Sequence, residues 1–319
     1  MRGMRRFGAL GRAGVSILAA CCCALASGAC LSSMYYHPDA RTYFTPQELG
    51  FHYQEFTLET ADGQSLKAWR IPAKRPHATI IQFHGNAQNM SAHFASLVWL
   101  VNFGFNLITF DYRGYGASTG EPDPAGLHAD ALRALRFAQN TVLQDRTPLI
   151  VYGQSLGGAV ALRAVPEMRG LPRPAAVVIE GSFASYRAVG AEKMDQWCFP
   201  PVPKMLSHLL DERYSPRESV ARIAPLPLII VHGTHDGIVP FHHGQEIYRL
   251  ARQPRVLLTM RGAGHLFWNQ PAATKLRPKF ARLLKGVAAG GDLNPLVLEF
   301  LTSGAGAAKP PTPTPSKAE

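Results

Sequence analysis

The sequence predicts an α/β fold in which a mostly parallel sheet carries helices on both faces. Short apolar segments recur along the chain and alternate with longer helical stretches, which is the pattern of successive βαβ units. The composition is that of a globular protein, with 46% hydrophobic and 17% charged residues. Its 319 residues suffice for one large α/β domain or two small ones.

The expected strands are short segments bounded by turn residues. The first two alternate polar and apolar residues, whereas 78–85 is a continuous apolar run typical of a strand buried on both faces. In chain order, the strands are expected at 53–60, 65–72, 78–85, 105–112, 148–153, 175–181, 227–233 and 255–262. Helices are expected at 91–103, at 125–139, directly after Ser155, near 241–251 and at 271–286.

The segments around and between these elements suggest the domain boundaries. The domain is expected at 46–290, after a signal or lipidation segment at 1–30 and a tether at 31–45. The connection at 184–224 is unusually long and mixes aromatic, proline and charged residues. It is either a short cap over the ends of the strands or a surface excursion with its own small core. Residues 291–319 form a C-terminal extension that ends in a Pro-, Ala- and Thr-rich, disordered tail.

The N-terminus reads as an export signal. A basic stretch, MRGMRRFGALGR, precedes an uncharged stretch rich in small residues that holds four of the five cysteines. This segment resembles a bacterial lipoprotein signal, in which SGAC would make Cys30 the lipidated anchor and LAAC would make it Cys21. Plain cleavage after ALA or an uncleaved anchor are alternatives. In each case we expect an exported protein of the bacterial cell envelope, facing the periplasm and, with a lipid anchor, attached to the membrane.

Charge and motifs exclude several function classes. The net charge is +11, but four of the arginines lie in the signal segment and the remaining charges are scattered, so nucleic-acid binding is not expected. A P-loop and a dinucleotide-binding glycine fingerprint are both missing from the sequence, and no cofactor is expected. A metal is not expected either, although several histidines cluster in sequence without an H-E-x-x-H pattern: His232, His235, His242 and His243.

A serine lies at the sharpest strand-to-helix junction of the chain. Gly153-Gln154-Ser155-Leu156-Gly157 follows the strand at 148–153 and opens an Ala-rich helix. A G-x-S-x-G sequence in this context is a nucleophile elbow, in which a tight, strained turn exposes the serine hydroxyl. The flanking glycines leave room for the neighbouring strand and helix. Ser155 is therefore the candidate nucleophile.

Two further polar residues follow later strands. Asp236 comes just after the strand at 227–233, and His265 comes just after the strand at 255–262. The carboxyl ends of parallel strands share one edge of the sheet, so both residues are expected near Ser155. A serine hydroxyl needs a base, for which His265 is the candidate, and Asp236 would fix the tautomer of the imidazole.

The loop after the strand at 78–85 supplies the remaining requirement of such a site. An oxyanion needs preorganised N–H donors. The amide of Leu156, directly after the candidate nucleophile, is one candidate, and the amide of Asn86 in the sequence HGNAQN is the other. His84 is expected to stabilise the turn rather than to act as a second base.

Five motifs, in order, resemble the α/β-hydrolase superfamily: HGNAQN, DYRGYGASTGEP, GQSLGG, HGTHDGIVP and GAGH. More narrowly, they resemble the Bem46-type serine hydrolases, which have a short cap and an HGN oxyanion loop. The resemblance covers about residues 45–290. It implies an eight-stranded, mostly parallel sheet that carries a Ser155–Asp236–His265 triad. DYRGYG is expected to be a structural turn beside the site.

The resemblance implies a hydrolase but leaves its substrate open. Members are carboxylesterases, thioesterases or depalmitoylases, and occasionally peptidases. We therefore expect a serine hydrolase that cleaves an ester or thioester of a small-molecule or acyl substrate through an acyl-enzyme. An apolar cap would suit acyl groups, and its apolar residues are Trp197, Phe199 and Leu206. Cys198, in the same segment, is expected to be structural.

Three alternatives remain. A peptidase or amidase would use the same triad, and a non-catalytic envelope binding module would keep the fold without turnover. Glu180, at the end of the strand at 175–181, is an alternative acid, because some hydrolases carry their acid at that strand.

Overall fold

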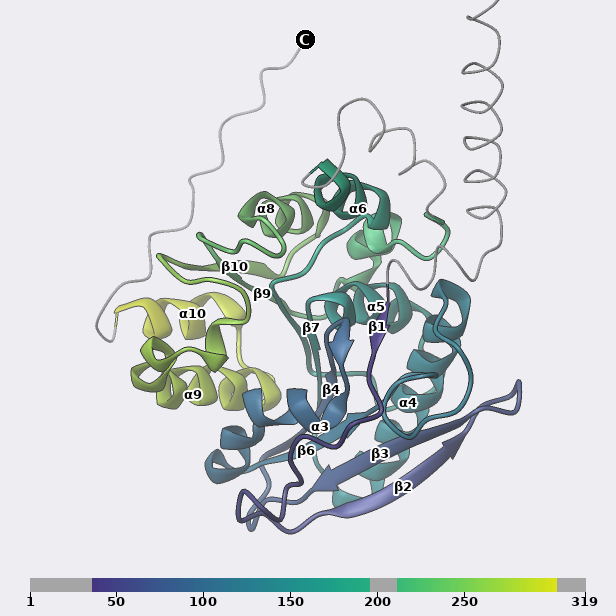
Figure 1. Cartoon of the computed structure of the whole chain (residues 1–319). Coiled ribbons are helices and arrows are strands. Elements are labelled where there is room, and N and C mark those ends of the chain that lie inside the picture. The colour runs from purple at the N-terminus through teal and green to yellow at the C-terminus, as the bar shows by residue number, and fades with distance from the viewer. Residues whose placement is uncertain (1–35, 196–210, 303–319) are drawn as a thin grey trace, which may run out of the picture. The chain divides into compact units, whose positions relative to one another are not determined.

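An eight-stranded sheet is the centre of the fold (Figure 1). The computed structural model describes residues 36–195 and 211–302. The strand order is β10-β9-β8-β7-β4-β6-β3-β2, and neighbouring strands are parallel except in the pairs β2–β3 and β3–β6. The eight strands are β2 (Gln54–Glu59), β3 (Ser65–Ile71), β4 (Ala78–Phe83), β6 (Phe105–Phe110), β7 (Leu149–Gln154), β8 (Ala176–Glu180), β9 (Leu228–Gly233) and β10 (Arg255–Met260). The predicted α/β fold class and its eight strands are confirmed.

Helices cover both faces of this sheet. The α-helices are α3 (Met90–His93), α4 (Pro124–Asp145), α5 (Leu156–Ala164), α6 (Tyr186–Asp195), α8 (Phe241–Leu250), α9 (Arg277–Ala288) and α10 (Leu293–Thr302). The 3₁₀ turns are η1 (Phe94–Ser96), η2 (Val98–Phe103), η3 (Val165–Glu167), η4 (Pro216–Glu218), η5 (Val220–Ile223), η6 (Phe267–Asn269) and η7 (Pro271–Lys275), and two short strands are β1 (His37–Pro38) and β5 (Ala87–Gln88). One apolar core joins the sheet to α3, η1, η2, α9 and α10, while α4, α5 and α8 pack on the opposite face. The central strands are therefore buried along their whole length.

The folded unit extends past the expected boundary at residue 290. Helix α10 buries Leu293, Val297 and Phe300 in the core, because this spacing places the three side chains on one helix face. Helix α10 packs closely against α9, because a Cβ at Gly286 of α9 would stand 2.4 Å from the side chain of Leu296 of α10. The tail expected to be disordered begins after this helix, and its residues 303–319 lie outside the described part.

The described part of the expected tether is bound to the folded unit. The side-chain amide of Asn89, which caps α3, donates to the carbonyls of Asp39 and Arg41, both at 2.7 Å. The amide of Asp39 donates in turn to the carbonyl of Gln88 at 3.3 Å. Residues 39–41 are thus attached to the loop that follows β4, rather than serving only as a spacer.

The expected cap is described only at its two ends. Helix α6 follows β8, and the turns η4 and η5 lead into β9. The apolar residues expected to line the cap, Trp197, Phe199 and Leu206, lie outside the described residues, as does Cys198. The same holds for the N-terminal segment with the two candidate anchors, Cys21 and Cys30. Within the described residues, no helix combines the length and the apolar character that crossing a membrane requires.

Candidate active site

Ser155 occupies a strained turn between β7 and α5. Its backbone has φ 53° and ψ −119°, a conformation that costs a non-glycine residue on the order of 1–3 kcal/mol. Two hydrogen bonds hold this conformation. The amide of Ser155 donates to the carbonyl of Glu180 at 2.9 Å, and the hydroxyl of Ser182 donates to the carbonyl of Ser155 at 2.8 Å. The turn therefore depends on the end of β8 as well as on its own residues.

The glycines around this serine permit close packing. A Cβ at Gly153 would stand 2.5 Å from the Cα of Gly158, and one at Gly157 would stand 2.1 Å from the carbonyl oxygen of Phe83. Both contacts are with backbone, which does not move aside as a flexible side chain would. The structure thus gives the two glycines the role that the sequence suggested.

Asp236 and His265 form a hydrogen-bonded pair. The imidazole Nδ1 of His265 lies 2.7 Å from Oδ2 of Asp236, and Oδ1 accepts the amides of Ile238 and Val239 at 2.9 and 2.8 Å. Burial by itself would raise the pKa of Asp236, but His265 and the two amides hold it below its ordinary value. An ionised carboxylate only accepts, so Nδ1 of His265 is the donor in this hydrogen bond.

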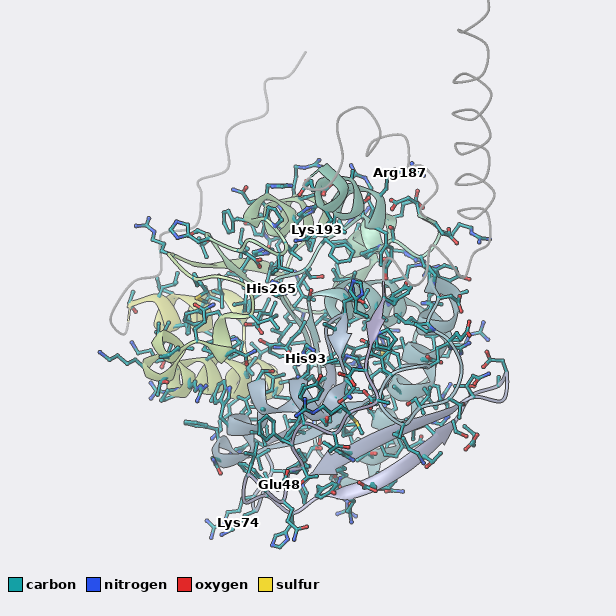
Figure 2. All side chains as sticks on the ribbon, in the orientation of Figure 1. Glu48, Lys74, His93, Arg187, Lys193 and His265 are labelled. Atoms are coloured by element: carbon teal, nitrogen blue, oxygen red, sulfur yellow. The ribbon has the colours of Figure 1, made fainter. Side chains whose placement is uncertain are left out.

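The end of β8 brings this pair next to Ser155. Gly181 follows Glu180, whose carbonyl binds the amide of Ser155. A Cβ at Gly181 would stand 3.0 Å from Nδ1 of His265 and 3.2 Å from Oδ2 of Asp236. The three residues expected as nucleophile, base and acid therefore gather around one point of the sheet edge, and Figure 2 labels His265 there.

Glu180, the alternative acid, is occupied elsewhere. Its buried carboxylate accepts the amide of Trp268 at 3.0 Å, the side chain of Gln154 at 2.8 Å and the hydroxyl of Tyr152 at 3.1 Å. Burial raises its pKa. Among the described residues it is Asp236, and not Glu180, that is hydrogen bonded to the His265 ring. Glu180 instead fixes the turn directly after His265.

The loop after β4 passes beside the serine. A Cβ at Gly85 would stand 3.6 Å from the Cβ of Ser155. The amide of Asn86, the next residue, therefore lies close to Ser155. Leu156 is the first residue of α5, and its amide is among the four at a helix start that have no acceptor within the helix. Both residues expected to hold an oxyanion thus border Ser155.

Two residues that support this loop were not anticipated as such. The hydroxyl of Tyr115 donates to the backbone and side-chain oxygens of Asn86, at 2.8 and 3.0 Å. The imidazole of His93 bonds the carbonyl of Ala87 at 2.8 Å and covers Gly85, whose Cβ would stand 3.0 Å from Cε1 of the ring. Burial lowers the pKa of His93 to about 4. Neither contact has a sequence motif: Tyr115 and Asn86 are 29 positions apart, and the His93–Ala87 contact depends on the conformation of the loop between them.

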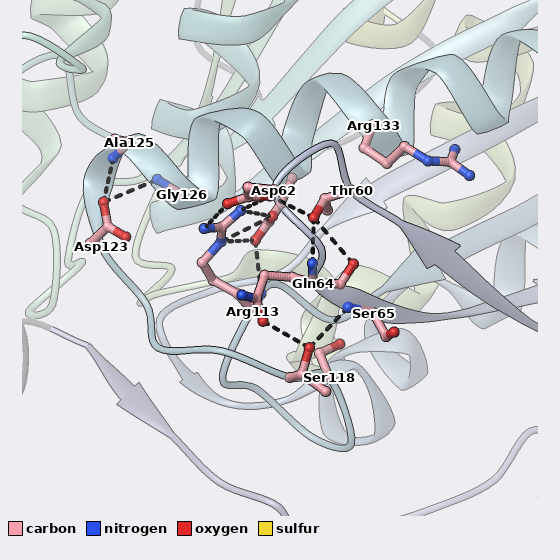
Figure 3. A network of polar contacts seen from close by, with 12 residues as sticks. Thr60, Asp62, Gln64, Ser65, Arg113, Ser118, Asp123, Ala125, Gly126 and Arg133 are labelled. Carbon is pink, nitrogen blue, oxygen red and sulfur yellow. Dashed lines mark hydrogen bonds and ion pairs between the residues drawn. The ribbon is translucent and has the colours of Figure 1, made fainter.

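The turn that carries Tyr115 has its own anchor (Figure 3). Arg113 donates to the buried carboxylate of Asp130 and, at 2.8 Å, to Asp62. The hydrogen bond from Arg113 lowers the pKa of Asp62 to about 2. These contacts fix the DYRGYG segment as a structural turn, as expected.

Of the clustered histidines, His232 supports the loop of Asp236. Its Nε2 donates to the carbonyl of Val239 at 2.8 Å and lies 3.5 Å from Oδ2 of Asp236. Burial lowers its pKa, so the ring is neutral near neutral pH. His242 and His243 instead bind the carboxylate of Glu192 on α6.

Comparisons with known proteins agree with this architecture. Residues 74–220 match the family model described as serine aminopeptidase, S33. The uncharacterized protein YfhR of Escherichia coli K12 is 35% identical over 241 residues, which cover 73% of this chain and 80% of YfhR. Protein bem46 of Schizosaccharomyces pombe is 32% identical over 202 residues, 61% of this chain and 64% of bem46. An esterase of Pyrococcus furiosus superposes with a TM-score of 0.65 at 20% identity, over 81% of this chain and 98% of the esterase.

Proposed function

The chain belongs to the α/β-hydrolase family as a Bem46-like member, and from this premise we propose that it cleaves a carboxylic ester or thioester through an acyl-enzyme at Ser155. The observation that carries the proposal is the hydrogen-bonded Asp236–His265 pair at the sheet edge where Ser155 sits in its strained turn. A single polar side chain at a strand end has many ordinary explanations. Here Asp236 and His265 both stand beside Gly181, and Ser155 is hydrogen bonded to the preceding Glu180, so the residue types that acyl transfer requires lie at one strand end.

In the acylation step, Oγ of Ser155 attacks the carbonyl carbon of the substrate, and Nε2 of His265 takes the hydroxyl proton. Asp236 remains ionised and stabilises the imidazolium. The amides of Leu156 and Asn86 bind the negative charge on the former carbonyl oxygen, where each such donor contributes roughly 10²–10³ in rate. The leaving alcohol or thiol departs with the proton from His265.

Deacylation repeats the same proton movements with water. His265 removes a proton from a water molecule, whose oxygen attacks the acyl carbon. The Ser155–acyl bond then breaks as His265 returns the proton to Oγ, and the carboxylic acid leaves. Apart from the substrate and water, these steps use groups of this chain.

A peptidase or amidase is the second candidate, favoured by the description of the matching family model. The two differ in the leaving group, because an amine must be protonated before it departs. p-Nitrophenyl esters of rising chain length and acyl thioesters, tested beside aminoacyl arylamides, separate them. Faster cleavage of the arylamides would favour the peptidase.

The proposal itself is tested with a fluorophosphonate probe, which reacts only with an activated serine. We expect the folded wild-type protein to be labelled and the Ser155→Ala variant to stay unlabelled. Absence of labelling in the wild type, or equal labelling of the variant, would refute a serine hydrolase and leave a binding module.

We also propose that the protein is exported to the bacterial cell envelope, facing the periplasm, and held at the membrane by a lipid on Cys30. The basic and small-residue stretches of the N-terminus support this proposal. Mass spectrometry of the mature N-terminus tests it. A lipid-modified Cys30 is expected, a modified Cys21 would move the anchor, and an unmodified N-terminus at Ser27 would refute lipidation.

A further inference from the structure

Two imidazoles and a carboxylate from distant parts of the chain converge between α6 and α8. The Nε2 atom of His242 lies 2.9 Å from one carboxylate oxygen of Glu192, and the Nε2 atom of His243 lies 3.1 Å from the other. The candidate ligand atoms of the three residues all lie within 4.8 Å of one another. No other group of this kind occurs among residues 36–195 and 211–302.

We propose that Glu192, His242 and His243 form a site for a divalent transition-metal ion of the Zn²⁺ class, which ties α6 to α8. The inference is independent of the proposed hydrolase activity. Imidazole and carboxylate are ligands that zinc prefers, and three protein ligands with one open position describe many zinc sites.

The geometry is close to what such an ion requires. With bonds of 2.0–2.2 Å, two ligands of a tetrahedral zinc ion stand roughly 3.3 Å apart. Each nitrogen lies at a comparable distance from its own oxygen of Glu192, 2.9 Å for His242 and 3.1 Å for His243. The two rings lie side by side, with centroids 4.4 Å apart and planes inclined by 33°. Small rotations of the exposed His242 and the half-buried Glu192 would complete the coordination, while the buried His243 stays in place.

The charges of the three ligands also suit a cation. Two neutral imidazoles and one carboxylate leave a zinc complex with one net positive charge. Each imidazole would present the lone pair of Nε2 to the metal and keep its proton on Nδ1. A water molecule would take the fourth position of the tetrahedron.

The location gives the site a mechanical consequence. Helix α6 begins the cap segment, and α8 follows the loop that carries Asp236 (Figure 1). Next to Glu192, the ammonium of Lys193, labelled in Figure 2, already reaches the carbonyl of Gly237 in that loop at 3.4 Å. A metal ion would replace hydrogen bonds between these elements by coordinate bonds, and so would hold the start of the cap against the domain.

Zinc titration of the metal-free, full-length protein tests the proposal. The wild type is compared with the double variant Glu192→Gln/His242→Ala, which leaves the buried His243 untouched. The double variant retains every cysteine, so zinc held by thiolates appears equally in both proteins. The matched control is His128→Ala, because His128 also pairs with a glutamate, Glu167, at 2.8 Å, but without a second imidazole.

We expect the wild type and the control to bind one more equivalent of Zn²⁺ than the double variant, with the affinity of that equivalent at least ~10-fold weaker in His242→Ala alone. Equal stoichiometry in all proteins would overturn the site.

Hydrogen exchange measures whether the metal ion holds α6 to α8. Zinc should slow exchange of the α6 amides in the wild type and leave it unchanged in the double variant. Zinc binding without slower exchange of the α6 amides would show that the ion does not hold α6 to α8. Equal far-ultraviolet circular dichroism in EDTA confirms that the variants are folded.

Discussion

Tyr115 and Asn86 are joined by a hydroxyl that donates to two oxygens of the same residue, at 2.8 and 3.0 Å. The contact connects the DYRGYG turn to the loop that borders Ser155. Arg113 of the same turn forms ion pairs with Asp62, between β2 and β3, and with Asp130 of α4. The position of the Asn86 amide therefore depends on Tyr115 and on the residues that anchor its turn.

The first prediction concerns this contact. Tyr115→Phe removes the hydroxyl and releases Asn86, so we expect kcat to fall about 10-fold, less than the 10²–10³ for loss of an oxyanion donor itself. KM should change little, and the free energy of unfolding should fall by about 1 kcal/mol. Esterase kinetics and urea unfolding measure the two effects. Tyr112→Phe is the control, because among residues 36–195 and 211–302 its hydroxyl makes one long bond, 3.3 Å to the backbone carbonyl of His84. Wild-type kcat in Tyr115→Phe would contradict the prediction.

The second prediction separates the two candidate acids. Asp236→Asn keeps the shape of the side chain but lets His265 adopt the wrong tautomer, so kcat should fall by about 10³–10⁴. Glu180→Gln should keep most of the activity and lose stability, by about 1–3 kcal/mol, because a buried amide cannot accept all three donors. Fluorophosphonate labelling rates and thermal unfolding measure both. The reverse pattern would assign the acid to Glu180.

The third prediction uses two glycines with similar backbones. Gly181 and Gly262 have φ of 57° and 71°, but only Gly181 has neighbours, since a Cβ at Gly262 would meet nothing within 4 Å. Gly181→Ala and Gly262→Ala should both lose about 1 kcal/mol of stability through the positive φ. Only Gly181→Ala should also lose kcat, by 10-fold or more, because its methyl group displaces the His265 ring. Equal kcat in the two variants would show that the ring tolerates the shift.

The fourth prediction concerns pH and His93. Its pKa is about 4 in the folded protein, below the ordinary value of about 6.5 expected in the unfolded chain. The unfolded chain therefore binds the proton first as the pH falls below 6.5. The stabilisation by neutral His93 is complete above that pH and is lost down to about pH 4. Between pH 7.5 and 5.0 this loss amounts to about 2 kcal/mol.

His93→Gln tests this linkage, because glutamine can still donate to Ala87 but does not titrate. Urea unfolding at pH 7.5 and 5.0 should show a smaller acid-induced loss in the variant, by about 2 kcal/mol. Other buried histidines act in the same direction and cancel in the comparison, among them His232 and His243. An equal loss in both proteins would mean that His93 is not the group responsible.

The sequence predicted those parts of the site that depend on local pattern. Ser155 was recognisable because its glycines, strand and helix are adjacent in sequence, and the positions of Asp236 and His265 followed from the strands before them. Their hydrogen bond needed only the rule that parallel strands end at one edge. The choice between Asp236 and Glu180 required the fold, since both are acidic residues at a strand end.

Contacts between distant segments could not be read in the same way. Tyr115 and Asn86 are 29 positions apart, and Glu192 and His242 are 50 apart. The first pair meets because the sheet places β4 beside β6, and the second lies on α6 and α8, which follow the neighbouring strands β8 and β9. Helix α10 was missed because its short apolar run follows two glycines and contains a proline, so that its burial against α9 decides its structure.

The attachment of residues 39–41 to Asn89 has a practical consequence for shortened versions of the protein. A chain trimmed to begin at residue 46, where the domain was expected to start, would leave the buried Asn89 amide without the two carbonyls that it binds. The neighbouring residues lead directly to Asn86. Removing this segment would thus loosen the loop beside Ser155. Inactivity of such a fragment would therefore say nothing about the enzyme's substrate.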